Sequence, residues 1–237
     1  KYGDVMAILA GMHYREAIFE ATRRSHKSRR IENVLSVALR RIIEGERLDV
    51  LFEQAGRESE YVKKIMRKSV SEKNYFEMVE AKTAVLFEAA CKVGGIVGNG
   101  TPSQVDALSK FGWNCGVAFQ IRDDILDIVG DTGELGKEAG KDIREHKLGN
   151  LALLYSFKEL LDKDKEKLTA ILRSPHVSGS NVGEGIEIVL STNAVERAYN
   201  KSKGFIETAK SSVDQIPSSE AKRMLLSLAG FIAERKF

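Results

Sequence analysis

Apolar residues recur every three or four positions along most of this chain, and this spacing limits the fold more than any other feature. Two examples are the series Val34, Val37, Ala38, Ile42 and the series Phe76, Val79, Thr83, Leu86, Phe87, Ala90. Residues at this spacing lie on one face of an α-helix. Segments that alternate every second residue, as strands do, are lacking. The sequence therefore predicts an all-α fold.

Prolines and glycines suggest where these helices begin and end. The sequence has three prolines, Pro102, Pro175 and Pro217, and each falls where a helix begins or a loop lies. Residues 98–100 (Gly-Asn-Gly) end one helix, and Pro102 helps to open the next. The expected helices cover residues 4–23, 31–55, 58–73, 75–98, 103–129, 148–162, 164–173, 192–214 and 218–235.

Smaller signals complete this outline. Ser103 and Thr192 are candidate N-caps for the helices that follow them. Residues 174–185 are rich in glycine and serine, so we expect a surface loop there. We find no repeat and no linker. The sequence therefore predicts a single helical domain over residues 1–237.

Composition narrows the class of protein. A hydrophobic content of 43% and a charged content of 30% are typical of a globular protein. A net charge of +3 is too small to suggest nucleic-acid binding. Cys91 and Cys115 lie in apolar stretches and are expected to be reduced, as in a cytoplasmic protein. No apolar run has the length of a membrane span and no signal peptide is visible, so we expect no stable membrane insertion.

One segment has the residues that most suggest a chemical function, and it is rich in carboxylates. It is Phe119-Gln120-Ile121-Arg122-Asp123-Asp124-Ile125-Leu126-Asp127. On a helix Gln120, Asp123 and Asp127 form one stripe, with Asp124 at its edge. The surrounding apolar residues indicate that this helix is half buried, and a cation would relieve the repulsion between the carboxylates. Mg²⁺ is the natural choice because it prefers oxygen ligands. The alternative is a solvated acidic face with no ligand.

Two lysines follow this acidic segment. Gly130, Gly133, Gly136 and Gly140 interrupt the helix, and Lys137 and Lys147 lie in or just after the interruption. A lysine acts toward phosphate as a point charge. Carboxylates for Mg²⁺ beside lysines for phosphate suggest a diphosphate substrate.

The acidic segment and the two lysines that follow it resemble the second aspartate-rich motif of the trans-isoprenyl diphosphate synthases, the polyprenyl synthetases. Its pattern here is F-Q-x-x-D-D-x-x-D followed by G-K-x-x-G-x-D-x-x-x-x-K. Residues 75–87 (YFEMVEAKTAVLF) are similar to the Lys-Thr helix of that family, with Lys82 and Thr83 at its centre. Gly45-Glu46 and Leu48-Asp49 fit the preceding helix. The resemblance covers essentially the whole chain, and it implies a helical bundle of the isoprenoid-synthase type around a central cavity.

The resemblance also implies an activity. The expected enzyme condenses isopentenyl diphosphate with an allylic diphosphate, giving a longer trans-polyprenyl diphosphate plus diphosphate. Three aspartates would hold Mg²⁺, directly or through water: Asp123 and Asp127, with Asp124 in support. Three lysines would neutralise the departing diphosphate: Lys82, Lys137 and Lys147.

Three further side chains are assigned from the same resemblance. Gln120 and the carbonyl of Thr83 would face the allylic carbon, and Phe119 would pack near the isopentenyl group. Lys82 is expected to face Asp123 across the cavity. Family members are usually homodimers, so we expect a homodimer here as well.

The sequence departs from the family pattern at its start. It begins at Lys1, after the position of the first aspartate-rich motif, and Met12 stands where the family usually has Asp. The chain is therefore interpreted as a C-terminal portion of a polyprenyl synthetase domain, as a chain whose upstream segment is not given, or as a subunit without the motif. The last case predicts a non-catalytic or regulatory subunit of a heteromeric synthase. A terpene cyclase or squalene-type synthase lacks support from the Gly-Lys and Lys-Thr segments.

Overall fold

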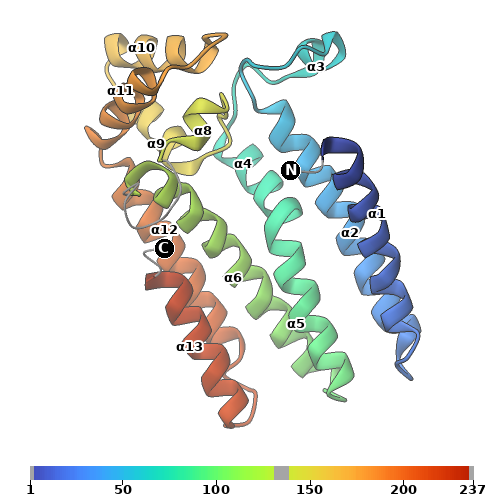
Figure 1. Ribbon diagram of the computed structural model, residues 1–237. Helices are drawn as coiled ribbons and strands as arrows, with labels where there is room; N and C mark the ends of the chain where they lie inside the picture. Colours follow the sequence, from blue (N-terminus) through green and yellow to red (C-terminus); the bar gives the residue numbers. More distant parts are fainter. Residues whose placement is uncertain (1–2, 131–138, 235–237) are drawn as a thin grey trace.

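The computed structural model describes residues 3–130 and 139–234, and these residues form helices and connecting turns without a β-strand. Figure 1 shows the long helices side by side, with the shorter helices gathered at one end of them. The long helices are α1 (Gly3–Thr22), α2 (Ser28–Leu51), α5 (Val85–Val97), α6 (Pro102–Val129), α12 (Ala194–Ser212) and α13 (Glu220–Glu234). The predicted all-α fold is confirmed.

The remaining elements are shorter, and most of them lie at one end of the long helices (Figure 1). They are α3 (Glu60–Ile65), α4 (Glu72–Val79), a π-helical turn η1 (Glu80–Ala84), α8 (Lys141–Arg144), α9 (Leu151–Glu159), α10 (Asp162–Arg173) and α11 (Gly179–Leu190). Helices α4, η1 and α5 follow one another without a break, so the predicted helix 75–98 is present but contains a π-helical turn.

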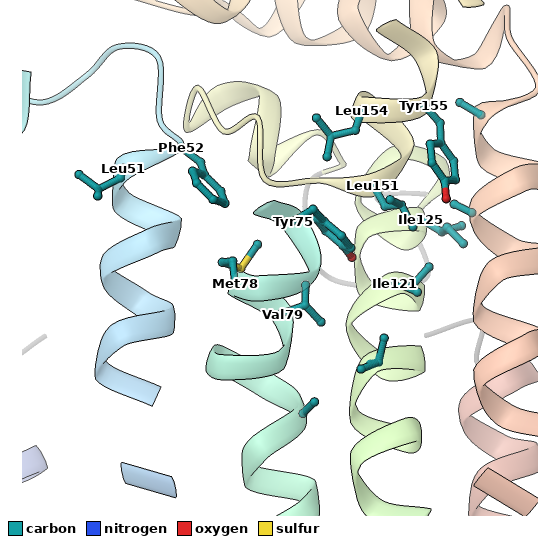
Figure 2. Close-up of a cluster of buried hydrophobic side chains, with 14 residues drawn as sticks. Leu51, Phe52, Tyr75, Met78, Val79, Ile121, Ile125, Leu151, Leu154 and Tyr155 are labelled. Atoms are coloured by element: carbon teal, nitrogen blue, oxygen red, sulfur yellow. The ribbon is translucent and has the colours of Figure 1, made fainter. Parts of the chain in front are cut away.

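Helix α6 lies in the middle of the molecule, and more than half of its residues are buried. One core cluster joins Tyr75 of α4, Ile121 of α6 and Leu151 of α9 with Phe52, which directly follows α2 (Figure 2). A second gathers Phe111, Cys115 and other residues of α6 with α12 and α13. Burying large apolar side chains contributes roughly 1.5–3 kcal/mol each, so α6 is the element around which the bundle forms.

Two sequence predictions about helix extent are wrong. Residues 174–185 were expected to form a loop, yet α11 begins at Gly179 behind an N-cap, Ser178, whose side chain accepts from the amide of Asn181. The apolar face of α11 buries Val182 and Val189, which outweighs the helix cost of its glycines. Residues 58–73 were expected to be one helix, but this range contains only the short helix Glu60–Ile65 and, after a non-helical stretch, the first residues of α4, which begins at Glu72.

A physical reason for this short helix lies in its backbone contacts. The Arg67 amide donates to the Leu51 carbonyl at 2.7 Å, and the Gln54 side chain donates to the Arg67 carbonyl at 2.7 Å. These bonds hold the chain in an extended course beside the end of α2, and a helix could not make them.

The two predicted N-caps are also corrected. Thr101, not Ser103, caps α6, because Pro102 occupies the first helical position and the cap precedes it. The Thr101 hydroxyl accepts from the Gln104 amide, and the Gln104 side chain accepts from the Thr101 amide. Helix α12 follows Asn193, and Thr192 contributes only a hydroxyl that accepts from the Ala194 amide at 3.2 Å.

Candidate active site at one end of the bundle

Two glycines of α6 set its register against α5. A Cβ at Gly116 would lie 2.6 Å from the Cα of Ala84, and one at Gly112 would lie 2.8 Å from the carbonyl carbon of Phe87. Only glycine permits such an approach of two backbones. Because the residue numbers rise along α6 as they fall along the neighbouring helix, the two helices run antiparallel.

The same register brings the sequence motifs together one and two turns further along. The Thr83 hydroxyl donates to Gln120 Oε1 at 2.7 Å, and Gln120 Nε2 donates to Asp124 Oδ1 at 3.1 Å. The Tyr75 hydroxyl donates to Asp124 Oδ2 at 2.7 Å, and Figure 2 shows this ring turned from α4 toward α6. The Lys-Thr segment and the acidic segment therefore face each other.

Asp124 is buried, and both of its carboxylate oxygens accept hydrogen bonds. Besides Tyr75 and Gln120, the Leu151 amide donates to Oδ2 at 2.9 Å. Burial, followed by the charge of Asp142, raises the pKa of Asp124 well above its usual range, although the hydrogen bonds oppose this shift. Asp124 thus ties α4, α6 and α9 together and orients Gln120.

Asp127, one turn further on, accepts two amides at the start of α8. The Lys141 amide donates to Oδ1 at 2.9 Å and the Asp142 amide to Oδ2 at 3.0 Å. Burial and the neighbouring charge of Asp142 raise the pKa of Asp127 to about 7. Each oxygen keeps a lone pair beyond the one it shares with an amide, so Asp127 can still bind a cation.

Asp49 forms a second centre between two lysines from other elements. Lys82 Nζ lies 2.9 Å and Lys147 Nζ 3.2 Å from Asp49 Oδ2. Helix α2 can approach Lys82 closely because Gly45 has no side chain. A Cβ at Gly45 would lie 2.6 Å from the Lys82 Cα. Burial lowers the pKa of each lysine, but Asp49 and other acidic neighbours outweigh this effect, so both pKa values are raised.

A polar cavity of about 450 Å³ opens beside these groups. Its lining includes Asp49, Lys82 and Lys147, together with Arg57 and His146. His146 has a left-handed backbone with φ of 62°, and its buried Nδ1 has no hydrogen-bond partner in residues 3–130 and 139–234. Both lysines therefore present charge to a space that is large enough for a small ligand.

Short backbone contacts connect the Asp49 centre with Asp127 of α6. The Leu148 amide donates to the Phe52 carbonyl at 3.1 Å and the Gln54 amide to the His146 carbonyl at 2.8 Å, which holds Lys147 against the end of α2. On its other side, the Lys147 amide donates to the Asp142 carbonyl at 2.8 Å. Since the Asp142 amide binds Asp127, a single residue links Asp127 to Lys147.

The remaining predicted residues lie as follows. Asp123 is half-buried on α6, and Phe119 packs on Phe87 with ring centroids 5.3 Å apart. Lys82 pairs with Asp49 and with Glu46 at 3.2 Å. Lys137 lies outside the described residues.

The carboxylates of this site suit a Mg²⁺ ion that protein, water and substrate bind jointly, rather than one that is enclosed by protein ligands alone. In the part of the chain that the structure describes, no group of three or more His, Cys, Asp or Glu side chains is arranged to hold a metal. Mg²⁺ seldom needs such a cage, since one or two carboxylates with water and substrate phosphates suffice. Asp123 and Asp127 lie four residues apart on one helix and provide such carboxylates.

Sequence reasoning missed three features of this site. Asp49 was noted only as part of a matching helix, although it holds both lysines. The π-helical turn that contains Lys82 and Thr83 has no sequence signal that we can identify, and such turns are frequent at functional sites. Asn150 donates to the Asp142 side chain at 2.9 Å and to the Asp124 carbonyl at 3.1 Å; its place before an apolar helix was a usable N-cap signal.

Comparison with known proteins identifies the family of this chain. Residues 1–189 match the family model described as polyprenyl synthetase. The chain belongs to the polyprenyl synthetase family. The short chain isoprenyl diphosphate synthase of Methanothermobacter thermautotrophicus is 36% identical over 238 residues, which cover 99% of this chain and 69% of that protein.

Solved structures of other polyprenyl synthetases share the fold. The geranylgeranyl pyrophosphate synthetase from Pyrococcus horikoshii Ot3 has a TM-score of 0.84 and 35% identity, over 98% of this chain and 68% of that one. The polyprenyl synthase from Caulobacter crescentus CB15, complexed with calcium and isoprenyl diphosphate, has a TM-score of 0.79 and 28% identity, over 92% and 61%. The predicted family and bundle are thus confirmed.

Proposed function

We propose that this polyprenyl synthetase condenses isopentenyl diphosphate with an allylic diphosphate to give a longer trans-polyprenyl diphosphate. The observation that carries the proposal is the link through Asp142, whose amide binds Asp127 and whose carbonyl binds the amide of Lys147. It joins a carboxylate suited to a cation with a lysine suited to phosphate. The synthase names of the relatives support the same activity.

The demanding step is charge separation. The bond between the allylic carbon and the diphosphate oxygen breaks, and the diphosphate leaves with the electron pair. Lys82 and Lys147 would donate hydrogen bonds to this leaving group. Asp49 holds both ammonium groups in position and keeps them protonated, so the charge that develops on the diphosphate meets donors already in place.

The allylic cation needs partial negative charge close to the reacting carbon. Gln120 would supply it through its side-chain oxygen and Thr83 through its carbonyl. The Thr83 hydroxyl and Asp124 fix the orientation of the Gln120 amide. The double bond of isopentenyl diphosphate then forms the new C–C bond, and a proton is lost. Phe119 would pack near the isopentenyl group.

We assign Mg²⁺ to Asp123 and Asp127. When bound, Mg²⁺ supplies positive charge that stabilises the leaving diphosphate. Asp124 supports the site by holding its helix, because its two oxygens already accept three donors. Lys137, in the segment that follows α6, would add a further charge.

We infer that the enzyme works as a homodimer in the cytoplasm. Helix α1 exposes an apolar row that a second copy would cover, with Val5, Ile8 and Met12 more than 60% exposed. Cys91 and Cys115 are free thiols. No helix in residues 3–130 and 139–234 is long and apolar enough to span a bilayer.

The test is to incubate the purified protein with isopentenyl diphosphate, farnesyl diphosphate and Mg²⁺. We expect a longer prenyl diphosphate and one equivalent of free diphosphate for each condensation. The alternative, a non-catalytic subunit, predicts no product from this chain alone and product once a catalytic partner is added. The relatives that cover almost the whole chain are named as synthases, which favours the catalytic assignment.

A further inference from the structure

A second and larger cavity lies between α9, α10 and the segment that leads into α4. Its volume is about 590 Å³, within the ~300–1,000 Å³ that small-molecule sites occupy. It shares no lining residue with the cavity beside Asp49. In Figure 1 these elements lie at the end of the bundle where the short helices gather.

The inner wall of this cavity is apolar. Its apolar lining residues come from three segments that the fold brings together: Val70, Leu148, Leu154, Phe157 and Leu172. Leu148 and Leu172 belong to a core cluster, against which Val70 and Phe157 pack while partly exposed. An apolar chain could therefore lie on a surface that the core already holds in shape.

Cationic side chains also line this cavity. Five lining residues are cationic, and one, Glu72, is anionic. Glu72 is already engaged, since Lys158 lies 3.0 Å away and the Tyr155 hydroxyl donates to it at 2.9 Å. The other four cations make no ion pair with any acidic group of the described residues: Lys68, Lys73, Lys165 and Arg173.

The geometry points to a binding site for a single-chain amphiphilic anion, with its hydrocarbon tail on the apolar wall and its phosphate head among the four lysine and arginine side chains. Like charges around a low-dielectric wall attract a counter-charge, and the apolar surface favours a chain over a simple ion. This site is separate from the candidate active site and does not depend on the proposed function.

The test is calorimetric titration with dodecyl phosphate below its micelle concentration. We expect 1:1 binding that the double variant Lys68→Glu/Arg173→Glu weakens ~10-fold, as reversal of two rim charges implies. Lys163→Glu is the matched control, because Lys163 is an exposed lysine of α10 outside the lining. It should leave the affinity within about twofold. Thermal unfolding verifies that both variants are folded.

Three further measurements decide between this site and its alternatives. Thr169→Trp, which places a large side chain in the cavity from α10, should abolish binding. Inorganic phosphate and dodecanol should each bind more weakly than dodecyl phosphate; equal binding of either would overturn the amphiphile assignment. Binding that Asp123→Ala weakens and the Lys68/Arg173 variant does not would assign the ligand to the candidate active site instead, and an absence of binding would also refute the proposal.

Discussion

The first half of helix α6 packs against α5 through Gly112 and Gly116, whereas its last turns carry Gln120, Asp124 and Asp127. In the first region small residues let two backbones approach closely, and apolar side chains fill the remaining space. In the second, carboxylates are buried and their pKa values are raised. Packing stabilises the first region, while buried carboxylates cost stability in the second. The comparison suggests that the second region is kept for chemistry.

The difference between the two regions is tested most strongly by removing one acidic residue from each end of α6. Asp123→Ala should lower turnover at least ~100-fold, because it removes a group that stabilises charge in the transition state. The matched control is Asp106→Ala, which deletes an exposed carboxylate paired with Lys110 at 2.8 Å. Steady-state kinetics should show less than about a twofold change for the control. Similar turnover for both variants would remove the distinction between the two ends.

The close packing of the first half of α6 is tested by Gly116→Ala. The new methyl group would meet the Cα of Ala84, a backbone atom that cannot move freely. We expect a loss of about 2 kcal/mol in the free energy of unfolding, measured in urea. Gly94→Ala in α5 is the control, because its added Cβ would meet no heavy atom within 4 Å apart from the adjoining backbone of its own helix; it should gain roughly 0.5 kcal/mol from helix propensity. Equal effects would mean that close packing does not set the register.

The carboxylates in the last turns of α6 predict that the free energy of unfolding depends on pH. The pKa of Asp127 rises from the usual 3.8 to about 7 on folding. The folded state therefore holds a proton that the unfolded state has lost, and stability should fall as pH rises from about 4 to about 7. Thermal unfolding across this range should show the decline, and Asp127→Asn, which has no carboxyl proton to lose, should make it shallower, while Asp124, whose pKa is also raised, continues to contribute. An unchanged slope in the variant would assign the decline to other groups.

The smallest effect concerns the thiol in the packed end. Burial, with a contribution from Cys91, raises the pKa of Cys115 to about 12, so little thiolate is present near neutral pH. A disulfide reagent should label native Cys115 slowly and label it quickly in urea. Rapid labelling of the native protein would show that this end of α6 opens more readily than its packing implies.

Much of this architecture follows from sequence pattern, because helix period and motif spacing are local properties. The stripe of Gln120, Asp123 and Asp127 was predictable for that reason. The role of Asp49 was not, since it depends on Gly45 allowing α2 to approach Lys82, a contact between residues far apart in the chain. Helix α11 was missed because glycine propensity was weighed without the burial of Val182 and Val189.

Binding of inorganic diphosphate in the presence of Mg²⁺, measured by calorimetry, tests the central claim most directly. Lys147→Met removes one cation of the proposed site, while Lys82 still pairs with Asp49. We predict an affinity at least ~10-fold lower than that of the unmodified protein, in line with the loss of a charged hydrogen bond. An unchanged affinity would contradict the assignment of the Asp49 centre to the leaving diphosphate.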